Sequence, residues 1–466
     1  MSDSPRSSPR ASIPPRVSGT LLLLTIGFAI AYACISLFRH WHFGSGYDLA
    51  IFDQAIWRLS HFDTPASTLS RHANIFGDHF SPILIVLTPI YWLAPAPETL
   101  LVAQALLLAS SIVPVHLCLR MRLDPGYAWP LTISYALFWG IQRTALSDFH
   151  ELAFAPLLLG LAVLAALRGR WGRLWIYVCL ICLTKEDLVP FLGGLGLYLT
   201  WTGAKRRGLL LIVTSIVAFL GIMTVVIPWL NGGQPSAYAG QYADLLARPW
   251  LIPVRLLTPM DKSETVLFWL LPFLFLPLFS SLSVLAVPIA IARLLSPNPN
   301  HWGHGGHYSA PLAPLLAMAA GDALSKISGR IADSVVRARA GRVIAILCVL
   351  SSALVPGHQP LLRLLSPGHY RARPGVAEVE RALRSIPPDA SVVSQAALAP
   401  HLSHRNALYL LESPLRDADY VVVSTTLDPW PLDGPDAVAQ AVDHYLAAGF
   451  QEIFRSTDCT ILRRSL

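Results

Sequence analysis

The chain has 466 residues, of which 54% are hydrophobic and only 14% are charged, and its mean hydropathy is +0.51. Soluble globular domains carry nearer a quarter of charged residues, and the apolar residues here gather in runs of membrane-spanning length. The composition excludes an ordinary soluble protein and predicts a polytopic α-helical membrane protein. The net charge of +7 does not indicate nucleic-acid binding, because most Arg and Lys lie in short loops beside apolar runs.

The first segment, residues 1–18, is a basic tail that is predicted to be cytoplasmic. The apolar run at 19–38 is too long for the core of a signal peptide, and no cleavage pattern of small residues follows it, so it is predicted to be an uncleaved signal anchor. A transmembrane domain is predicted over residues 19–356, with a first outer loop at 39–96. A small α/β extracytoplasmic domain is predicted over residues 357–466.

About eleven membrane spans are predicted from the apolar runs. They cover residues 19–38, 97–119, 126–141, 152–167, 174–184, 187–202, 208–230, 264–279, 281–295, 308–325 and 343–356. A further apolar piece at 83–93 is short and bounded by prolines, and is predicted to be a re-entrant or interfacial helix. With the N-terminus in the cytoplasm, the clusters of Arg and Lys fall in cytoplasmic loops, as the positive-inside rule requires.

The first outer loop holds the carboxylates Asp48 and Asp53. Carboxylates near a bilayer surface are costly to dehydrate and mark a candidate site. On a helix, their spacing would separate them by about 140°, so they would not share a face. Asp48 is predicted either to cap a helix over residues 49–60, or to deprotonate a hydroxyl or hold a divalent cation. The apolar side chains of this helix would hold it in the membrane–water interface, with Gln54 and Arg58 facing water.

Further ionisable side chains are predicted on the same face. His79 is either a simple hydrogen-bonding residue or a contact to phosphate or metal. The third outer corner brings Arg143, Asp148, His150 and Glu151 together within nine residues. Capping of a helix by Asp148 explains part of this cluster, but it leaves His150 and Glu151 as candidate substrate-binding residues at the mouth of a span.

Lys185, Glu186 and Asp187 interrupt an apolar stretch and are predicted to form a tight outer hairpin. They form either an ion pair that caps two helix ends, or a site where Lys185 holds an anionic phosphate and Glu186 tunes it. The loop at 301–308 carries three histidines at a spacing of three, but its three glycines disfavour a helix that would align them as metal ligands. This loop is predicted to touch substrate.

The C-terminal segment has the pattern of a small α/β domain. Strands are predicted at residues 391–394, 407–411, 420–425 and 460–462, and helices at 378–385 and 436–448.

Four motifs in this order resemble an uncharacterised family of predicted bacterial polytopic membrane proteins. They are Tyr47-Asp48-Leu49-Ala50-Ile51-Phe52-Asp53-Gln54-Ala55-Ile56-Trp57, His79-Phe80-Ser81-Pro82, Asp148-Phe149-His150-Glu151 and Lys185-Glu186-Asp187. The resemblance extends from about residue 20 to 420. That family in turn resembles, by its layout, the GT-C superfamily of integral-membrane glycosyltransferases.

The resemblance implies a transferase of the bacterial inner (cytoplasmic) membrane that takes a sugar from a polyprenyl-phosphate donor at the outer leaflet. Its partners would be membrane lipid, this donor and an acceptor of unspecified chemistry, with no nucleic acid. The general base would be Asp48, with Asp53 as the other candidate. The candidate cations for binding the lipid phosphate are Lys185, Arg143, His79 and Arg255. The candidate cofactor is a divalent cation, and its ligands are left unassigned.

Two other functions are compatible with the composition. A transporter or flippase for lipid or small solutes would have pseudo-symmetric halves and helices broken at mid-membrane, and the sequence shows no internal repeat. A non-catalytic membrane scaffold would tolerate Asp48→Asn without consequence.

Overall fold

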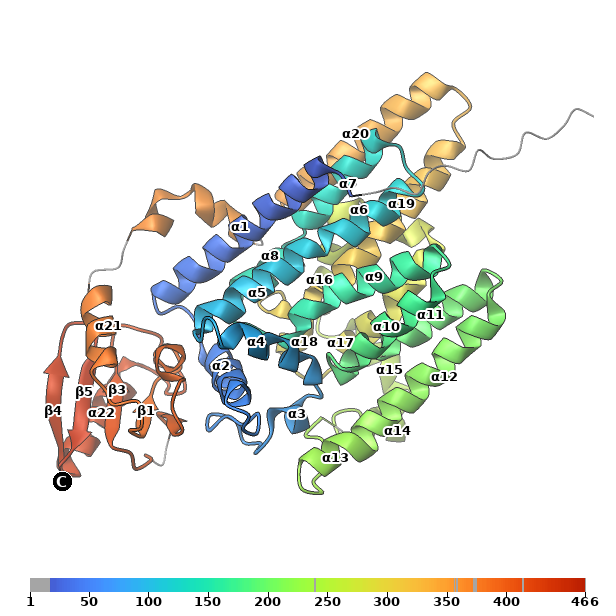
Figure 1. The fold of residues 1–466 in the computed structure, drawn as a ribbon. Helices are drawn as coiled ribbons and strands as arrows, with labels where there is room; N and C mark the ends of the chain where they lie inside the picture. The colour runs from blue at the N-terminus through green and yellow to red at the C-terminus, as the bar shows by residue number, and fades with distance from the viewer. Residues whose placement is uncertain are drawn as a thin grey trace, which may run out of the picture.

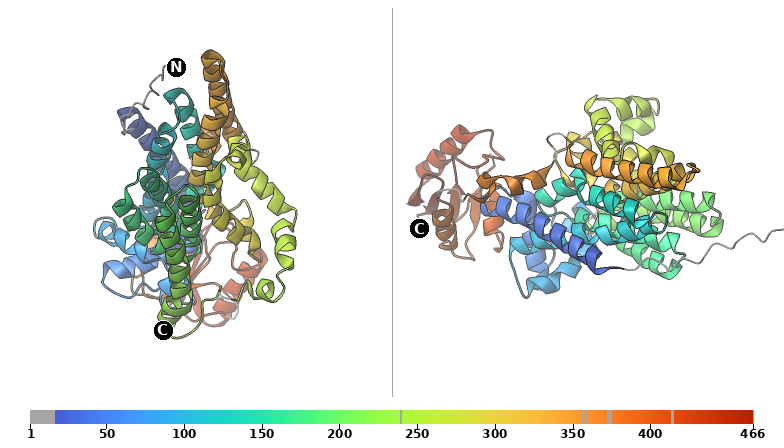
Figure 2. Two further views of the ribbon diagram at one scale, coloured as in Figure 1. Left: turned by 90° about the vertical axis from the view of Figure 1, so that its right-hand side faces the viewer. Right: turned by 90° about the horizontal axis from the view of Figure 1, so that it is seen from above.

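A computed structural model describes residues 17–238, 240–355, 357, 359–371, 375–412 and 415–465. The predicted basic tail, apart from its last two residues, lies outside these ranges. The described chain forms a helical part, followed by a C-terminal domain that contains a sheet (Figure 1). The C-terminal domain lies at one end of the helical bundle, as the further views in Figure 2 also show.

The helical part consists mainly of apolar helices packed side by side. The longer ones are α1 (Gly19–Trp41), α5 (Pro97–Ser110), α6 (Ile112–Arg120), α7 (Pro125–Ala136), α8 (Trp139–Leu146), α9 (Ala155–Leu167), α10 (Trp171–Cys182), α11 (Pro190–Trp201), α12 (Lys205–Gly221), α16 (Asp261–Leu270), α17 (Val287–Leu295), α19 (Leu312–Gly329) and α20 (Ser334–Ala353). Between them lie α2 (Tyr47–Ser60) and the short helices α3 (Ile75–Asp78), α4 (Thr88–Tyr91), α13 (Ile227–Leu230), α14 (Ala243–Ala247), α15 (Leu251–Leu257) and α18 (Pro299–Trp302).

Among the described residues, three stretches are long and apolar enough to cross a membrane by length and composition: Gly19–Trp41, Pro97–Arg120 and Lys205–Leu230. On the outward face of the last one, Leu209 and Val217 have exposed fractions of 61% and 64%. Such a face is unfavourable in water, whereas a helix in lipid satisfies its own backbone polar groups. The count of eleven spans stays a prediction.

The span predicted over residues 264–279 is not one continuous helix. α16 ends at Leu270, and 3-10 turns (Leu271–Phe273 and Leu276–Phe279) carry the chain onward. Proline lacks the backbone N–H that a helix interior requires, and Pro272 and Pro277 interrupt this segment. The run is apolar, as predicted, but its prolines break the helix.

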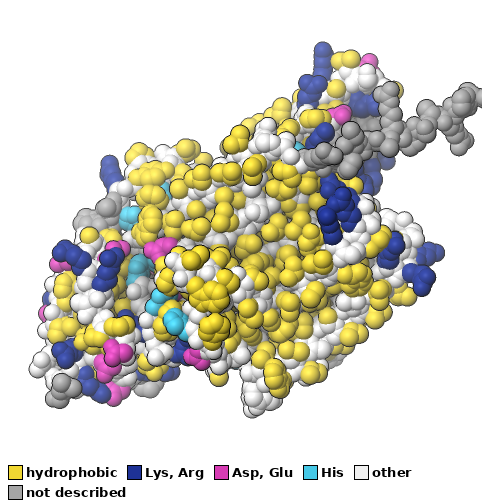
Figure 3. All heavy atoms as spheres, in the orientation of Figure 1, with side chains coloured by type: hydrophobic (Ala, Val, Ile, Leu, Met, Phe, Trp, Pro, Cys, Tyr) yellow, Lys and Arg dark blue, Asp and Glu magenta, His cyan; other side chains and the backbone are white. Residues whose placement is uncertain are grey.

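Lys and Arg side chains gather at the ends of the helices far from the C-terminal domain, near the start of α12 and around α20 (Figure 3). Hydrophobic side chains cover the surface between these ends and that domain. The arrangement is what the positive-inside pattern predicts for one cytoplasmic face. The orientation in the membrane itself stays a prediction.

The C-terminal domain is a mixed sheet with the strand order β2-β1-β3-β5-β4, in which β2, β1 and β3 are parallel. Its elements are β1 (Val392–Ser394), β2 (Leu408–Leu410), β3 (Tyr420–Val423), β4 (Phe450–Arg455), β5 (Thr460–Arg464), α21 (Val376–Arg384) and α22 (Pro435–Ala447). The predicted strands and helices are confirmed, and β4 was missed. This edge strand is largely exposed and lacks the alternation of buried and exposed residues that marks a strand in sequence.

Hydrogen bonds join the C-terminal domain to α2. The side-chain amide of Gln54 donates to the carbonyl of Arg405 (2.7 Å), and Arg58 donates to the carbonyl of Asn406 (2.8 Å). Gln54 and Leu49 are fully buried. The expectation that α2 floats in the interface with Gln54 facing water is therefore wrong, because its partners come from a segment some 350 residues further along the chain.

Candidate active site

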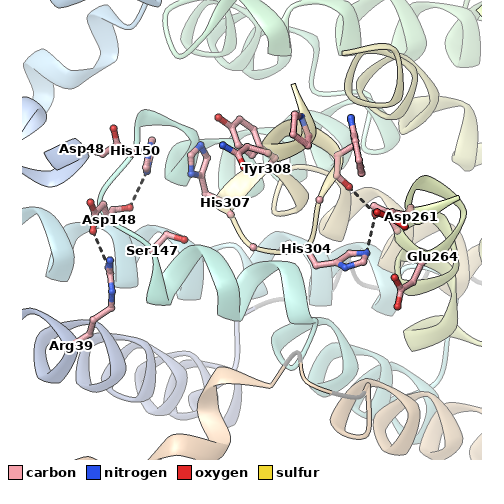
Figure 4. A pocket seen from close by; sticks show the side chains of 17 residues that line it. Arg39, Asp48, Ser147, Asp148, His150, Asp261, Glu264, His304, His307 and Tyr308 are labelled. Carbon is pink, nitrogen blue, oxygen red and sulfur yellow. Dashed lines mark hydrogen bonds and ion pairs between the residues drawn. The ribbon is translucent and has the colours of Figure 1, made fainter. Parts of the chain in front are cut away.

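A cavity of about 540 Å³ lies beside the first turn of α2, and we call it the Asp48 cavity (Figure 4). Its charged and aromatic lining consists of Arg39, Asp48, Asp148, His150, Asp261, Glu264, Trp302, His304, His307 and Tyr308. Asp48 and His150 lie at one end, Asp261 lies at the other, and His307 and Tyr308 lie between them (Figure 4). The structure thus joins the first outer loop, the third outer corner and the histidine loop in one site.

Asp148 fixes the start of α2 and thereby the position of Asp48. Its carboxylate accepts from the backbone N–H of Gly46 (2.9 Å) and of Leu49 (3.3 Å), and from the Arg39 guanidinium (2.8 Å). A Cβ on Gly46 would lie 3.1 Å from this carboxylate, so a glycine suits the close approach. The capping role considered for Asp48 belongs to Asp148, which leaves the Asp48 side chain 40% exposed at the cavity.

His150 is the ionic partner of Asp48. Its Nε2 lies 3.3 Å from the Asp48 carboxylate, and its Nδ1–H donates to the carbonyl of Asp148 (2.9 Å). Burial disfavours a charge on this ring, but the hydrogen bond and the charge of Asp48 outweigh it and raise the pKa of His150. An imidazolium satisfies both acceptors, so the ring bridges the Asp48 side chain and the carbonyl of Asp148.

His307 stacks on His150 with ring centroids 3.5 Å apart. Burial, and then the positive charge of His150, hold the pKa of His307 well below its usual value. The Nε2 of this neutral ring is buried and has no hydrogen-bond partner among the described residues. A neutral ring with a free nitrogen therefore lies beside the charged one, at the middle of the cavity.

Two ion pairs, one of them buried at both side chains, support the wall behind these histidines. Lys185 donates to Glu151 (2.6 Å), with side-chain exposures of 4% and 1%, and His79 lies 2.6 Å from Glu186. Burial disfavours the Lys185 charge, but Glu151 outweighs it and raises the pKa of Lys185 well above its usual value. Burial and Lys185 likewise oppose a charge on His79, but Glu186 raises its pKa. These four candidates lie close to the cavity without lining it.

Asp53 lies away from the Asp48 cavity and is fully buried. Its carboxylate accepts from the hydroxyls of Tyr91 (2.5 Å) and Ser403, and it lies 2.9 Å from Nε2 of His404. Ser403 and His404 belong to the C-terminal domain. The second candidate base is therefore placed between the two parts of the chain.

Arg143 and Arg255 line two separate cavities. Arg143 donates to the carbonyl of Gly357 (2.7 Å) beside a cavity of about 350 Å³. Arg255 pairs with Asp244 and borders a cavity of about 300 Å³, of which Trp302 is also a wall. The structure brings neither arginine to Asp48.

Sequence reasoning missed Arg39, Asp261 and Glu264 as lining residues. Arg39 lies in the last turn of α1, and Asp261 and Glu264 lie in the first turn of α16. A charge is common at a helix end, so no sequence signal distinguishes these residues. His304, His307 and Tyr308 fall in the loop that was predicted to touch substrate. Within the described residues, there is no group of three or more His, Cys, Asp or Glu side chains that could hold a metal ion.

Known proteins share the sequence pattern and the fold of this chain. The model of the family described as "Predicted membrane protein (DUF2079)" matches residues 39–446, most of the chain. The chain belongs to this family. None of the curated proteins matches it.

The fold of this DUF2079 protein is similar to that of ArnT from Cupriavidus metallidurans, a GT-C glycosyltransferase. The structure of ArnT bound to undecaprenyl phosphate has a TM-score of 0.60 and 13% sequence identity, over 96% of this chain and 98% of ArnT. The apo structure of ArnT gives 0.59 and 13%, over 95% and 97% of the two chains. At this identity the comparison shows the fold: a GT-C architecture with a small C-terminal sheet domain.

Proposed function

We propose that this protein is a membrane glycosyltransferase that moves a sugar from a polyprenyl-phosphate donor to an acceptor hydroxyl at the outer face of the bacterial inner membrane. The observation that carries the proposal is Asp48, a partly exposed carboxylate held beside His150 at the cavity of a GT-C fold. The structure of ArnT with undecaprenyl phosphate supports the choice of donor. The polar residues at one end of the bundle support it against a transport pathway, which would require them at mid-membrane.

The reaction follows from the position of Asp48. The acceptor oxygen forms a bond to the anomeric carbon while its proton passes to the Asp48 carboxylate. The bond between the anomeric carbon and the phosphate oxygen breaks, and its electron pair leaves with the phosphate. Because His150 pairs with the carboxylate in the resting site, it orients Asp48 as a positioning residue.

The cation that we assign to the departing phosphate is Arg293, which is near Tyr308 of the wall but is not itself a lining residue of the Asp48 cavity. It is buried, with 7% exposure, and donates to the carbonyl of His301 (2.7 Å) and to the hydroxyl of Ser309 (2.9 Å), next to Tyr308 of the cavity wall. Its Nη2 has no hydrogen-bond partner among the described residues. An unpaired buried donor is costly, and a phosphate oxygen would satisfy it. We assign the phosphate to Arg293; Lys185, whose charge is paired with Glu151, stays behind the wall.

The test is transfer from a panel of radiolabelled polyprenyl-phosphate sugars by the full-length protein in lipid. Asp48→Asn is expected to lower the rate by roughly 10²- to 10⁴-fold, the usual contribution of a general base. Asp63→Asn is the matched control, because Asp63 is an exposed carboxylate of the same loop outside the cavity. Equal transfer by wild type and Asp48→Asn would remove Asp48 from the mechanism and make Asp53 the next candidate. Absence of transfer with every donor would favour the transporter or scaffold.

A further inference from the structure

One loop of the C-terminal domain reaches the start of α2. It follows β3 and contains Asp428 and Trp430. The side-chain amide of Gln395 donates to the carbonyl of Asp428 (3.1 Å), and the backbone N–H of Ala396 donates to the carbonyl of Trp430 (3.1 Å). Both donors lie just beyond the carboxyl end of β1, the edge at which α/β sheets commonly bind ligands. The sheet therefore holds this loop, and with it Trp430, in a defined place.

The Trp430 ring stacks on Tyr47, the residue directly before Asp48. The ring centroids are 4.6 Å apart with an interplanar angle of 27°, and Trp430 is 42% exposed. Burial, and then the negative charge of Asp48, raise the pKa of Tyr47 to about 12, so its hydroxyl stays protonated and can donate. A half-exposed tryptophan and a phenol donor thus lie immediately beside the proposed base.

The charge of the Asp48 cavity restricts what can lie against these rings. Its lining holds four carboxylates, those of Asp48, Asp148, Asp261 and Glu264, against two cations, since the imidazolium of His150 pairs with Asp48 and the guanidinium of Arg39 pairs with Asp148. An anionic acceptor would be repelled by this lining. A neutral polyhydroxylated ring fits it, because carboxylates accept hydrogen bonds from hydroxyls and the apolar C–H face of a sugar can pack on an aromatic face.

We propose that Tyr47 and Trp430 form a sugar-binding platform, contributed jointly by α2 and the C-terminal domain, that receives the acceptor as a neutral carbohydrate ring. Binding at this platform is independent of the transfer reaction, whereas its role as the acceptor site rests on the proposed function. The C-terminal domain is then part of the active site.

The experiment is saturation-transfer-difference NMR on the full-length protein in lipid nanodiscs, with methyl α-mannoside, methyl β-galactoside and methyl N-acetyl-β-glucosaminide as probes. At least one glycoside is expected to receive saturation on its ring C–H protons. Trp430→Ala is expected to weaken its binding roughly tenfold, the loss of one aromatic contact, and Trp430→Tyr to retain it. Trp201→Ala is the matched control, since Trp201 is an exposed tryptophan (77%) at the end of α11, outside α2 and the C-terminal domain.

Three results would overturn the platform: no saturation of any glycoside, equal saturation in wild type and Trp430→Ala, or saturation of choline in place of the glycosides, which would indicate a cation-binding aromatic site. Thermal unfolding of each variant separates loss of binding from loss of folding. Because the probes report binding without a donor, a failed transfer assay and a failed platform give different results.

Discussion

Asp48 and Asp53 show how two like residues in one helix acquire different roles. Asp48 lies in the first turn of α2, partly exposed and beside His150. Asp53 lies more than a turn later on another face, fully buried and surrounded by donors from Tyr91 and the C-terminal domain. A buried carboxylate that accepts several hydrogen bonds has a structural role, whereas a partly exposed one at a cavity can contact a substrate. The environment, not the residue type, separates them.

At the same scale, the charge of His150 predicts a dependence of stability on pH. The folded state raises the pKa of His150 above its unfolded value of about 6.5. Its stabilising contribution is therefore fully present below the unfolded pKa and is lost as the pH rises through the folded pKa. We expect the difference in melting temperature between wild type and His150→Gln to be largest under acidic conditions and to shrink with rising pH. A difference that grew with pH would show that His150 is neutral in the folded protein.

At the scale of elements, the Lys185–Glu151 pair joins two turns of the bundle, the one between α8 and α9 and the one between α10 and α11. Each side chain is almost completely buried, so water cannot solvate either charge when its partner is removed. The pair fixes the wall that carries His150, although it does not line the cavity itself. The sequence placed both residues on the same face but did not pair them, because their positions are 34 residues apart.

Breaking this pair should destabilise the protein more than removing it. Lys185→Met leaves Glu151 buried without its cation, and we expect a loss of about 3–5 kcal/mol in the free energy of unfolding. Adding Glu151→Leu removes the unpaired charge and should recover much of that loss. Denaturant unfolding in detergent, with both single variants and the double variant, measures the coupling. Additive losses would mean that the two side chains do not interact.

At the scale of the whole molecule, the basic loops are separated from the C-terminal domain. This separation predicts that the two regions are accessible from opposite sides of the membrane. Asp389→Cys places a thiol on an exposed position before β1, and Arg206→Cys places one in the first turn of α12. A membrane-impermeant maleimide is expected to label the first in intact cells and the second only after permeabilisation, with the wild-type chain as the background control. Labelling of Arg206→Cys in intact cells would reverse the orientation.

The sequence predicted the helical class, the sheet domain and the polar clusters because each follows from a local signal: an apolar run, a strand pattern, or a charge in an apolar context. It missed the burial of Gln54 and the role of Asp148 as the cap of α2. Both depend on partners about 100 to 350 residues away, and no local pattern encodes such contacts. The interruption after α16 was accessible from Pro272 and Pro277, since prolines are visible in sequence.

The ties between α2 and the C-terminal domain have a consequence for biosynthesis. Ser403 and Arg405 lie in the last portion of the chain, yet they hold the helix that carries Asp48. When every long helix of the bundle has been synthesised, the contacts that hold α2, and with it the proposed base Asp48, are therefore still missing. The proposed active site is completed only when the final segment has been synthesised and folded, so we expect a prematurely terminated chain to lack activity.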